Sequence, residues 1–234
     1  MLHFSFRLTA SWILALGMVL GLRGALWADD SDPANAAAVH RGRIVVLGDS
    51  ITAGYGLDPS DAYPARLQDK IDASELPFAV VNAGVSGDTT AGGLRRVNWA
   101  LANGADVLIV ALGGNDGLRG ISPDQTAKNL RGIVEKARGK SPGIEVILTG
   151  MQMPGNMGQD YVEKFRDLFP AVAKETKARL IPFLLEGVGG DAQLNQPDRI
   201  HPNAEGQKIV AANVWRGLEP VLRKRMPAAS AAGP

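Results

Sequence analysis

The chain has 234 residues, of which 45% are hydrophobic and 21% charged, a composition typical of globular domains and unlike that of disordered or fibrous chains. Lys and Arg number 25 against 24 Asp and Glu, so the formal charge is +1 and the basic surface that nucleic acids require is not expected. The absence of cysteine excludes disulfides, thiolate nucleophiles and cysteine-ligated zinc.

An apolar run near the N-terminus is typical of a secretory signal peptide. Arg7 precedes 15 residues from Leu8 to Leu22, and small residues then lead through Ala28 to the acidic Asp29. A membrane-spanning helix needs about 20 apolar residues, so the run is short for a permanent anchor, which is the minority alternative. We therefore expect removal of residues 1–28, a periplasmic or secreted protein, and no stable membrane insertion after cleavage.

Composition divides the rest of the chain into three parts. Residues 29–42 are rich in Ala, Asp and Ser without apolar periodicity and are expected to form a flexible leader. Residues 227–234 are similar and are expected to form a disordered tail. Residues 43–226 contain no break in composition and no internal repeat, so they are expected to form one domain.

Five short apolar segments are expected to form strands. The first four lack the alternation of half-exposed strands and are typical of a parallel sheet that is buried on both faces, whereas the fifth pattern is weaker. The segments are residues 43–48, 78–82, 106–112, 145–149 and 178–181.

Segments with helical periodicity separate these strands, at residues 64–71, 92–102, 123–138, 161–177 and 203–222. Ser122, Pro123 and Gln125 form the pattern of a capping box at the start of the third helix. The alternation of strands and helices indicates an α/β sandwich with a mostly parallel sheet. Its active site should lie at the carboxyl ends of the strands.

Small and polar residues follow three of the predicted strands, as GDSITAG at 48–54, NAGVSGDT at 82–89 and GGND at 113–116. Glycines allow tight turns and a close approach of backbone N–H groups to a ligand, while Ser, Asn and Asp supply functional groups. Each loop alone is typical of an ordinary turn. Their coincidence at one edge of the sheet favours an active site.

Histidines limit the choice of a general base. His3 lies in the predicted signal peptide and His40 in the leader, so His201 is the one candidate within the domain. Asp198, three residues earlier, could orient the ring through its other nitrogen. The alternative is that Asp198 caps the last helix and that His201 is a surface turn residue. With one histidine and no cysteine in the domain, we expect no catalytic metal other than an all-carboxylate site.

Ser50 is the candidate nucleophile, because it lies where a buried strand meets a glycine-rich turn. Ser86 is the alternative nucleophile. It precedes Gly87 in a loop whose backbone N–H groups are expected to be more useful to the site than the serine hydroxyl. An acyl-transfer site also needs donors for a developing oxyanion, and the N–H groups of Ser50 and Gly87 and the side-chain amide of Asn115 could supply them. Asp49 fits a plain turn role as well as a role in orienting the Ser50 loop, and it is left outside the catalytic set.

Together these segments resemble the blocks of the SGNH (GDSL) hydrolase family, from residue 43 to about residue 222, and in particular its branch of thioesterase I, lysophospholipase L1 and arylesterases. The resemblance implies a flavodoxin-like three-layer α/β/α sandwich with a five-stranded parallel sheet, and a serine esterase without a cofactor. Ile51 replaces the family's leucine, a change of similar volume. By this resemblance the catalytic residues are Ser50, Asp198 and His201, and the oxyanion hole is formed by Ser50, Gly87 and Asn115.

Residues 151–157, after the fourth strand, combine methionines with proline and glycine, which suits a mobile wall of an acyl pocket. Tyr161 and Phe165 could extend this wall, but aromatic residues four apart on a helix usually face the core. The resemblance implies short to medium acyl chains on alcohol, aryl or thiol leaving groups, including lysophospholipids. The expected partner is thus a small acyl ester, and the sequence carries no indication of oligomeric state. The candidate substrate-binding residues are Met151, Met153, Pro154 and Met157.

Two other functions are compatible with the same scaffold. A carbohydrate O-acetylesterase of the cell envelope would act on acetyl esters alone. A non-catalytic binding module belongs to a different class, because a fold does not dictate a function. The presence of Ser50, Asn115, Asp198 and His201 together disfavours the module, since a binding protein does not need all four.

Overall fold

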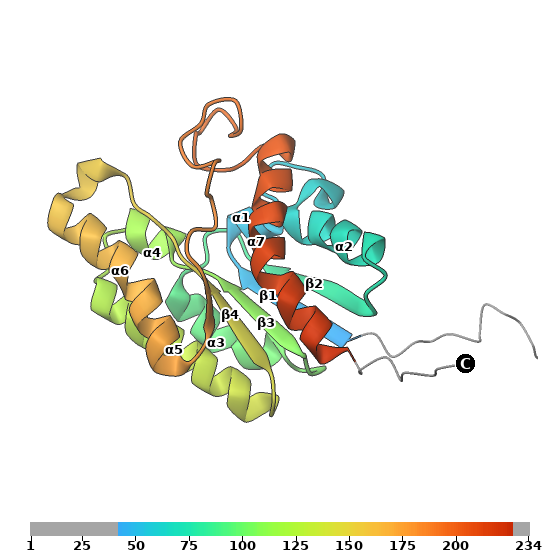
Figure 1. Cartoon of the computed structure of the whole chain (residues 1–234). Coiled ribbons are helices and arrows are strands. Elements are labelled where there is room, and N and C mark those ends of the chain that lie inside the picture. Colours follow the sequence, from blue (N-terminus) through green and yellow to red (C-terminus); the bar gives the residue numbers. More distant parts are fainter. Residues whose placement is uncertain (1–41, 227–234) are drawn as a thin grey trace, which may run out of the picture. The chain divides into compact units, whose positions relative to one another are not determined.

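Five parallel strands form one sheet in the order β2-β1-β3-β4-β5 (Figure 1). The structure, a computed structural model, describes residues 42–226. The strands are β1 (Gly42–Gly48), β2 (Phe78–Gly84), β3 (Val107–Ala111), β4 (Glu145–Thr149) and β5 (Arg179–Ile181). All five strands predicted from the sequence are therefore present, including the weak fifth one.

Burial of the strands follows their place in the sheet. β1, β3 and β4 lie inside the sheet and most of their residues are buried, as their continuous apolar sequences predict. β2 is an edge strand, and Val80 and Val81 are only partly buried while Asn82 is exposed. The prediction that this strand is buried on both faces was therefore wrong, because helices and a neighbouring strand cover an edge strand less completely.

The five predicted helices are present with ends shifted by a few residues. The longer helices are α2 (Tyr63–Ala73), α3 (Thr90–Ala100), α5 (Pro123–Lys140), α6 (Gln159–Thr176) and α7 (Ala204–Arg225). Helices α2 and α7 pack against each other on one face of the sheet, and α3, α5 and α6 form the layer on the other face (Figure 1). The result is the three-layer α/β/α sandwich that the resemblance implies.

Short helices were missed by the sequence analysis. They are α1 (Ser50–Ala53) and α4 (Gly114–Leu118), together with the 3-10 turns η1 (Pro59–Asp61) and η2 (Gly155–Met157). Elements of three to five residues are too short to show a helical period in the sequence. Both α1 and α4 begin two or three residues after a strand ends, so these missed elements carry residues of the candidate site.

The start of α5 differs from the predicted capping box. Pro123 is the first helical residue as predicted, but the Ser122 side chain caps no backbone N–H group. Gln125 Nε2 donates instead to Asn129 Oδ1 at 2.9 Å, one turn further along the helix. The side-chain contact available within the helix replaces the reciprocal cap that the sequence pattern predicts.

The described residues belong to one compact unit. The predicted signal peptide at 1–28 and the tail at 227–234 lie outside them, as does the leader except for Gly42, which is the first residue of β1. Between residues 42 and 226, no helix is both long and apolar enough to cross a membrane.

Candidate active site

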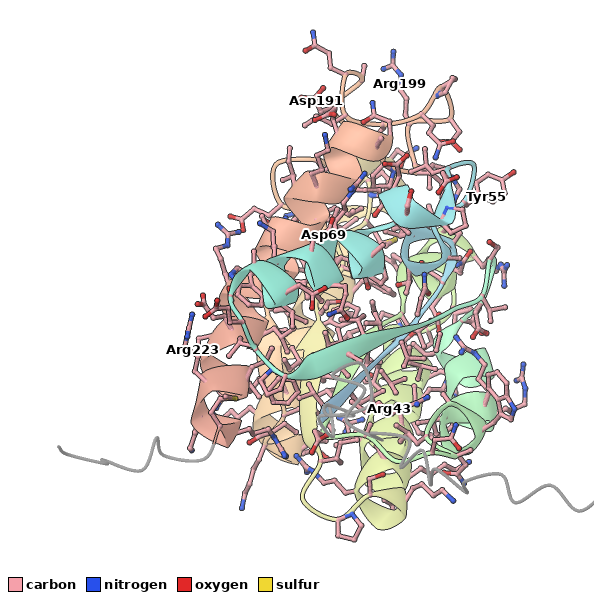
Figure 2. The ribbon with its side chains drawn as sticks, turned by 90° about the vertical axis from the view of Figure 1, so that its right-hand side faces the viewer. Arg43, Tyr55, Asp69, Asp191, Arg199 and Arg223 are labelled. Carbon is pink, nitrogen blue, oxygen red and sulfur yellow. The ribbon has the colours of Figure 1, made fainter. Side chains whose placement is uncertain are left out.

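The polar loops identified in the sequence meet at the carboxyl edge of the sheet. Strand order reverses between β1 and β3, and at such a point the connections diverge to opposite faces and leave a crevice. Figure 2 shows Tyr55 and Arg199 near this edge, whereas Arg43, at the start of β1, lies near the opposite edge. The site is therefore where the α/β topology predicts it.

Ser50 is placed by the sharp transition from β1 into α1. The Asp49 carboxylate accepts a hydrogen bond from the Ile51 N–H at 3.0 Å and so caps α1, whose first residue is Ser50. Gly54 ends this single turn in the left-handed conformation, with φ of 76°. The serine is held on a short, defined turn, with its side chain directed toward the loop before α7.

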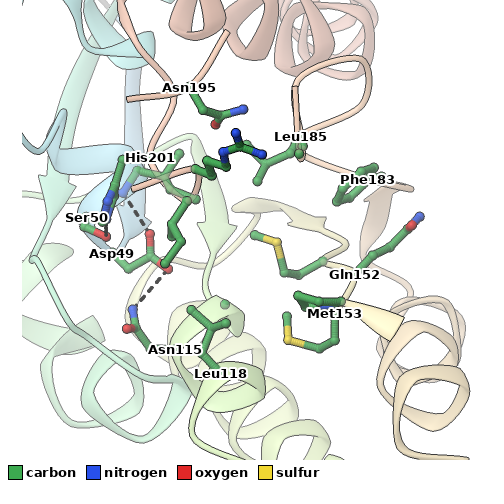
Figure 3. Close-up of a pocket in the computed structure, with 18 residues that line it drawn as sticks. Asp49, Ser50, Asn115, Leu118, Gln152, Met153, Phe183, Leu185, Asn195 and His201 are labelled. Atoms are coloured by element: carbon green, nitrogen blue, oxygen red, sulfur yellow. Dashed lines mark hydrogen bonds between the residues drawn. The ribbon is translucent and has the colours of Figure 1, made fainter. Parts of the chain in front are cut away.

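Ser50, His201 and Asp198 form a continuous hydrogen-bonded chain. His201 Nε2 lies 2.9 Å from Ser50 Oγ, and His201 Nδ1 lies 2.7 Å from Asp198 Oδ2 (Figure 3 shows the first of these bonds). An ionised carboxylate can only accept, so Nδ1 carries the proton and Nε2 is left to accept from the serine hydroxyl. This is the tautomer that a general base requires.

The loop before α7 is shaped around Asp198. Its Oδ1 accepts from the Ile200 N–H at 2.9 Å and from the His201 N–H at 3.0 Å. The bonds from the His201 N–H and ring, followed by that from Ile200, lower the pKa of Asp198 to about 2. Asn203 rather than Asp198 caps α7, through its bond from the Gly206 N–H. The reading of Asp198 as a helix cap was therefore wrong.

Asn115 and Gly87 lie in the connections that follow β3 and β2, respectively. Asn115, in α4, lines the same pocket as Ser50, and its Nδ2 donates to the Asp88 carbonyl at 2.9 Å. Gly87 has a φ of 76°, a conformation that favours glycine, and its carbonyl accepts from Arg119 Nη2 at 3.0 Å. Within residues 42–226 the Gly87 N–H has no hydrogen-bond acceptor, which leaves it available to a ligand. Gly87 itself is not among the residues that line the pocket.

Asp49 connects the serine turn to Asn115. The side chain is 2% exposed, and its Oδ2 lies 3.5 Å from Asn115 Nδ2 (Figure 3). Burial, the largest influence, raises the pKa of Asp49 to about 6, although the bond from the Ile51 N–H acts in the opposite direction. The carboxyl group is thus mainly ionised at pH 7 and becomes protonated in mildly acidic solution.

A pocket of about 520 Å³ opens beside Ser50 (Figure 3). Of the predicted substrate-binding residues, Met151, Met153 and Pro154 line it. Further apolar side chains come from α1, from α4 and from the segment between β5 and α7, and an apolar wall of this kind suits a hydrocarbon chain. The large apolar side chains are Ile51, Leu118, Met151, Met153, Phe183, Leu185 and Ile200.

Other residues considered from the sequence lie outside this pocket. Met157 packs against the hydrophobic core, and Ser86 is exposed. Phe165 is fully buried, while the Tyr161 hydroxyl donates to the Ile121 carbonyl at 2.8 Å and its ring stacks on Phe165. These two aromatic residues are part of the core, as their spacing on a helix indicates.

One wall of the pocket was not predicted. Residues 183–201, between β5 and α7, contribute Phe183, Leu185 and Ile200, and this segment has no regular periodicity in the sequence. Tyr55 was also missed, although its ring centroid lies 4.7 Å from that of His201. Its position directly after the Ser50 turn, ahead of Gly56, was the one available signal.

Comparison with known proteins agrees with this geometry. Residues 46–209 match the GDSL-like Lipase/Acylhydrolase family. The chain is 46% identical over 180 residues to Esterase TesA of Pseudomonas aeruginosa, an alignment that covers 76% of this chain and 89% of that protein. It is 39% identical over 180 residues to the thioesterase 1/protease 1/lysophospholipase L1 of Escherichia coli, which covers 76% of this chain and 84% of that protein.

A solved structure shares the fold as well as the sequence. The crystal structure of TesA superposes with a TM-score of 0.73 and 44% sequence identity, covering 76% of this chain and 99% of that one. The chain therefore belongs to the GDSL-like lipase/acylhydrolase family.

Proposed function

We propose that the protein is a serine carboxylic ester hydrolase that forms an acyl-enzyme on Ser50. The observation that carries this proposal is the hydrogen-bonded chain from Ser50 through His201 to Asp198, which lies beside an apolar pocket. Such a chain activates a hydroxyl group for attack on an acyl carbon. The names of the relatives, an esterase and a thioesterase/lysophospholipase, support the same reaction class.

In the proposed acylation step, His201 Nε2 takes the Ser50 hydroxyl proton as Oγ bonds to the carbonyl carbon of the ester. The carbonyl oxygen becomes an oxyanion, for which the N–H groups of Ser50 and Gly87 and the amide of Asn115 are the proposed donors. His201 then gives its proton to the leaving oxygen, and the alcohol departs. Asp198 keeps the ring in the required tautomer and stabilises its positive charge.

In the deacylation step, water replaces the alcohol and the same groups act again. His201 removes a proton from water, the hydroxide bonds to the acyl carbon, and the second oxyanion uses the same donors. Collapse of this intermediate breaks the bond to Ser50 Oγ, which recovers a proton from His201. The products are a carboxylic acid and the regenerated enzyme.

The pocket supports acyl chains longer than acetate. Its volume of about 520 Å³ and its apolar side chains exceed what an acetyl group needs. We therefore propose short to medium acyl chains on aryl, alkyl or thiol leaving groups, with lysophospholipids as further substrates. No feature of the pocket favours the O-acetylesterase or the binding module.

Hydrolysis of p-nitrophenyl esters from acetate to long acyl chains tests this proposal. The purified protein should show its highest kcat/KM at short or medium chains, and Ser50→Ala should lose nearly all turnover. Ser86→Ala serves as the matched serine control and should retain wild-type kcat. Activity confined to acetate, or full activity in Ser50→Ala, would contradict the proposal.

We also propose export to the periplasm with removal of residues 1–28. The apolar run at residues 8–22 and the small residues before Asp29 support it. N-terminal sequencing of protein recovered from the periplasmic fraction of an expressing bacterium should begin within several residues of Asp29. Recovery in the membrane fraction with Met1 retained would indicate an anchor instead.

A further inference from the structure

Arg96, in the second turn of α3, contacts two loops of the candidate active site. Its Nη2 donates to the Gly48 carbonyl at 2.8 Å and its Nη1 to the Ala83 carbonyl at 2.7 Å. Its Nε donates to Asp88 Oδ2, also at 2.7 Å. One guanidinium group therefore binds the end of β1, the end of β2 and the loop that follows β2.

Two of these three contacts, those to Gly48 and Asp88, are close in sequence to a proposed oxyanion donor. Gly48 is two residues before Ser50, and Asp88 directly follows Gly87. The Asp88 carbonyl also accepts the hydrogen bond from Asn115 Nδ2 at 2.9 Å. Arg96 thus binds residues close in sequence to the Ser50 and Gly87 N–H groups. It also binds Asp88, the residue whose carbonyl orients the Asn115 amide.

Arg96 is well placed to hold a fixed geometry. Its side chain is 17% exposed and that of Asp88 is 11% exposed, so water screens their interaction little. The Gly48 carbonyl also accepts from the Val85 N–H at 3.0 Å, which joins the two loops directly. A planar guanidinium with donors in a rigid fork can bind three acceptors in different directions, whereas a lysine ammonium on a flexible stem cannot reproduce that arrangement.

We propose that Arg96 is a positioning residue, which sets the distance between the Ser50 turn and the Gly87–Asp88 loop so that the three oxyanion donors converge. It touches neither substrate nor reacting atoms. This inference rests on the proposed hydrolase function and adds a residue that the nucleophile, base and donors do not include. A misplacement of about 1 Å in such a site is enough to cost on the order of 10²-fold in rate.

The test is steady-state kinetics of Arg96→Lys and Arg96→Met, with Arg95→Lys and Arg95→Met as matched controls. Arg95 is the adjacent residue of α3, and its side chain is exposed. The Arg96 variants should lose about 10- to 100-fold in kcat with KM within about twofold of wild type, because the donors act on the transition state. The Arg95 variants should keep the wild-type kcat. If kcat of the Arg96 variants stays within threefold of wild type, the proposal is overturned.

Chemical rescue separates positioning from folding. In Arg96→Ala, millimolar guanidinium ion should restore kcat at least fivefold, because the ion can occupy the vacated space and bind the same acceptors. Sodium chloride at equal ionic strength should restore nothing. If Arg96→Ala does not fold, Arg96→Lys supplies the same test through its kinetics and its melting temperature. Loss of kcat that follows only the loss of folded protein would mean a structural role alone.

A double-mutant cycle with Asn115→Ala tests whether Arg96 changes kcat by way of the Asn115 amide. If Arg96 acts through the oxyanion donors, Arg96→Lys should reduce kcat less in the Asn115→Ala background than in wild type. Equal fold losses in both backgrounds would contradict action through Asn115 and the loop that orients it.

NMR distinguishes failure of this inference from failure of the proposed function. In ¹⁵N-labelled protein, Arg96→Lys should shift the backbone amide signal of Gly87 and the side-chain amide signals of Asn115, while Arg95→Lys should leave them in place. Shifted signals in a protein that hydrolyses no ester would reject the hydrolase proposal and retain the positioning role. Unshifted signals would reject the positioning role whatever the activity.

Discussion

Asp198 acts on His201 through two parts of the histidine, its ring and its backbone. One carboxylate oxygen accepts from the ring Nδ1, and the other accepts from the N–H groups of Ile200 and His201. The same residue therefore sets the ring's tautomer and the shape of the loop that carries it. The spacing of three residues between Asp198 and His201 makes both contacts possible. This spacing is a weak pattern in the sequence, but in the structure it gives a defined hydrogen-bonded loop.

Asp198→Asn should separate these two functions. The amide oxygen can still accept from the backbone N–H groups, but its NH2 group would face Nδ1 and favour the tautomer in which Nε2 carries the proton. That ring cannot take the Ser50 proton, and the corresponding change in serine proteases costs about 10⁴-fold in kcat. We expect a similar loss of kcat on a p-nitrophenyl ester, measured at a temperature where the variant is fully folded. Retention of more than a tenth of wild-type kcat would contradict the assigned role.

Asp49 makes a pH-dependent contribution of the opposite sign to that of Asp198. Its folded pKa, about 6, lies above the unfolded value of 3.8, so the folded state holds the proton more tightly. The resulting stability is present below pH 3.8 and is lost as the pH rises through 6. For Asp198, with a folded pKa of about 2, stability is present above pH 3.8 and is lost as the pH falls toward 2.

Asp49→Asn should remove the pH dependence of stability that comes from the raised pKa of Asp49. Because the buried amide never ionises, the free energy of unfolding of the variant relative to wild type should rise by about 2 kcal/mol between pH 4 and pH 8. Urea titrations at unit pH intervals measure this difference, in which the titration of all other groups largely cancels. A constant difference across that range would mean that the Asp49 pKa is not raised.

At the scale of elements, the sequence predicts long segments better than short ones. The strands and the five longer helices are recognisable because their apolar residues repeat over several turns or lie in continuous runs. Helices α1 and α4 are too short for a period, although their glycines and polar residues mark the site. Residues 183–201 carry no periodic signal, so their place along the pocket depends on tertiary contacts that the local sequence does not encode.

Helix α4 and the segment after β4 both contribute residues to the pocket wall. A methyl group added at Gly117 would lie 2.0 Å from Met153 Sδ, and Met153 lines the pocket. The flexible thioether must therefore move, and in Gly117→Ala we expect it to shorten the pocket. The acyl chain with the highest kcat/KM should become shorter on the p-nitrophenyl ester series, while Met153→Ala should make it longer.

The control for this prediction is Gly155→Ala. Its added methyl group would have no neighbour within 4 Å, although the residue lies in the same segment as Met153. This variant should keep the wild-type chain-length profile. An unchanged profile in both Gly117→Ala and Met153→Ala would place the acyl chain elsewhere.

At the scale of the whole molecule, the site depends on bringing together residues that are far apart in sequence. Ser50 and His201 are separated by 151 positions, and Gln207 connects α7 to the turn that carries Ser50. Gln207, 1% exposed in α7, accepts from the Tyr63 N–H at 3.0 Å and donates to the Ile51 carbonyl at 3.1 Å. Helix α7, with the His201 loop before it, is thereby attached to the turn that carries Ser50.

Gln207→Leu should weaken both the fold and the site. It leaves two buried backbone groups without partners, and each such group costs about 1–3 kcal/mol. We expect the free energy of unfolding in urea to fall by about 2–4 kcal/mol, and kcat to fall at temperatures where the variant is still folded. Lys208→Met, at the exposed neighbouring position, should change neither. An unfolding free energy within about 0.5 kcal/mol of wild type would show that α7 is held in place by other contacts.

Covalent labelling tests most directly whether Ser50, activated by His201, is the nucleophile. A p-nitrophenyl alkylphosphonate should transfer its phosphonyl group to Ser50 Oγ with release of p-nitrophenol, and mass spectrometry of the digested protein should locate the added mass on the peptide that contains Ser50. Ser50→Ala should gain no mass, and Ser86→Ala should be labelled like wild type. Labelling at Ser86, or of wild type and Ser50→Ala alike, would contradict a nucleophile at Ser50 activated by His201.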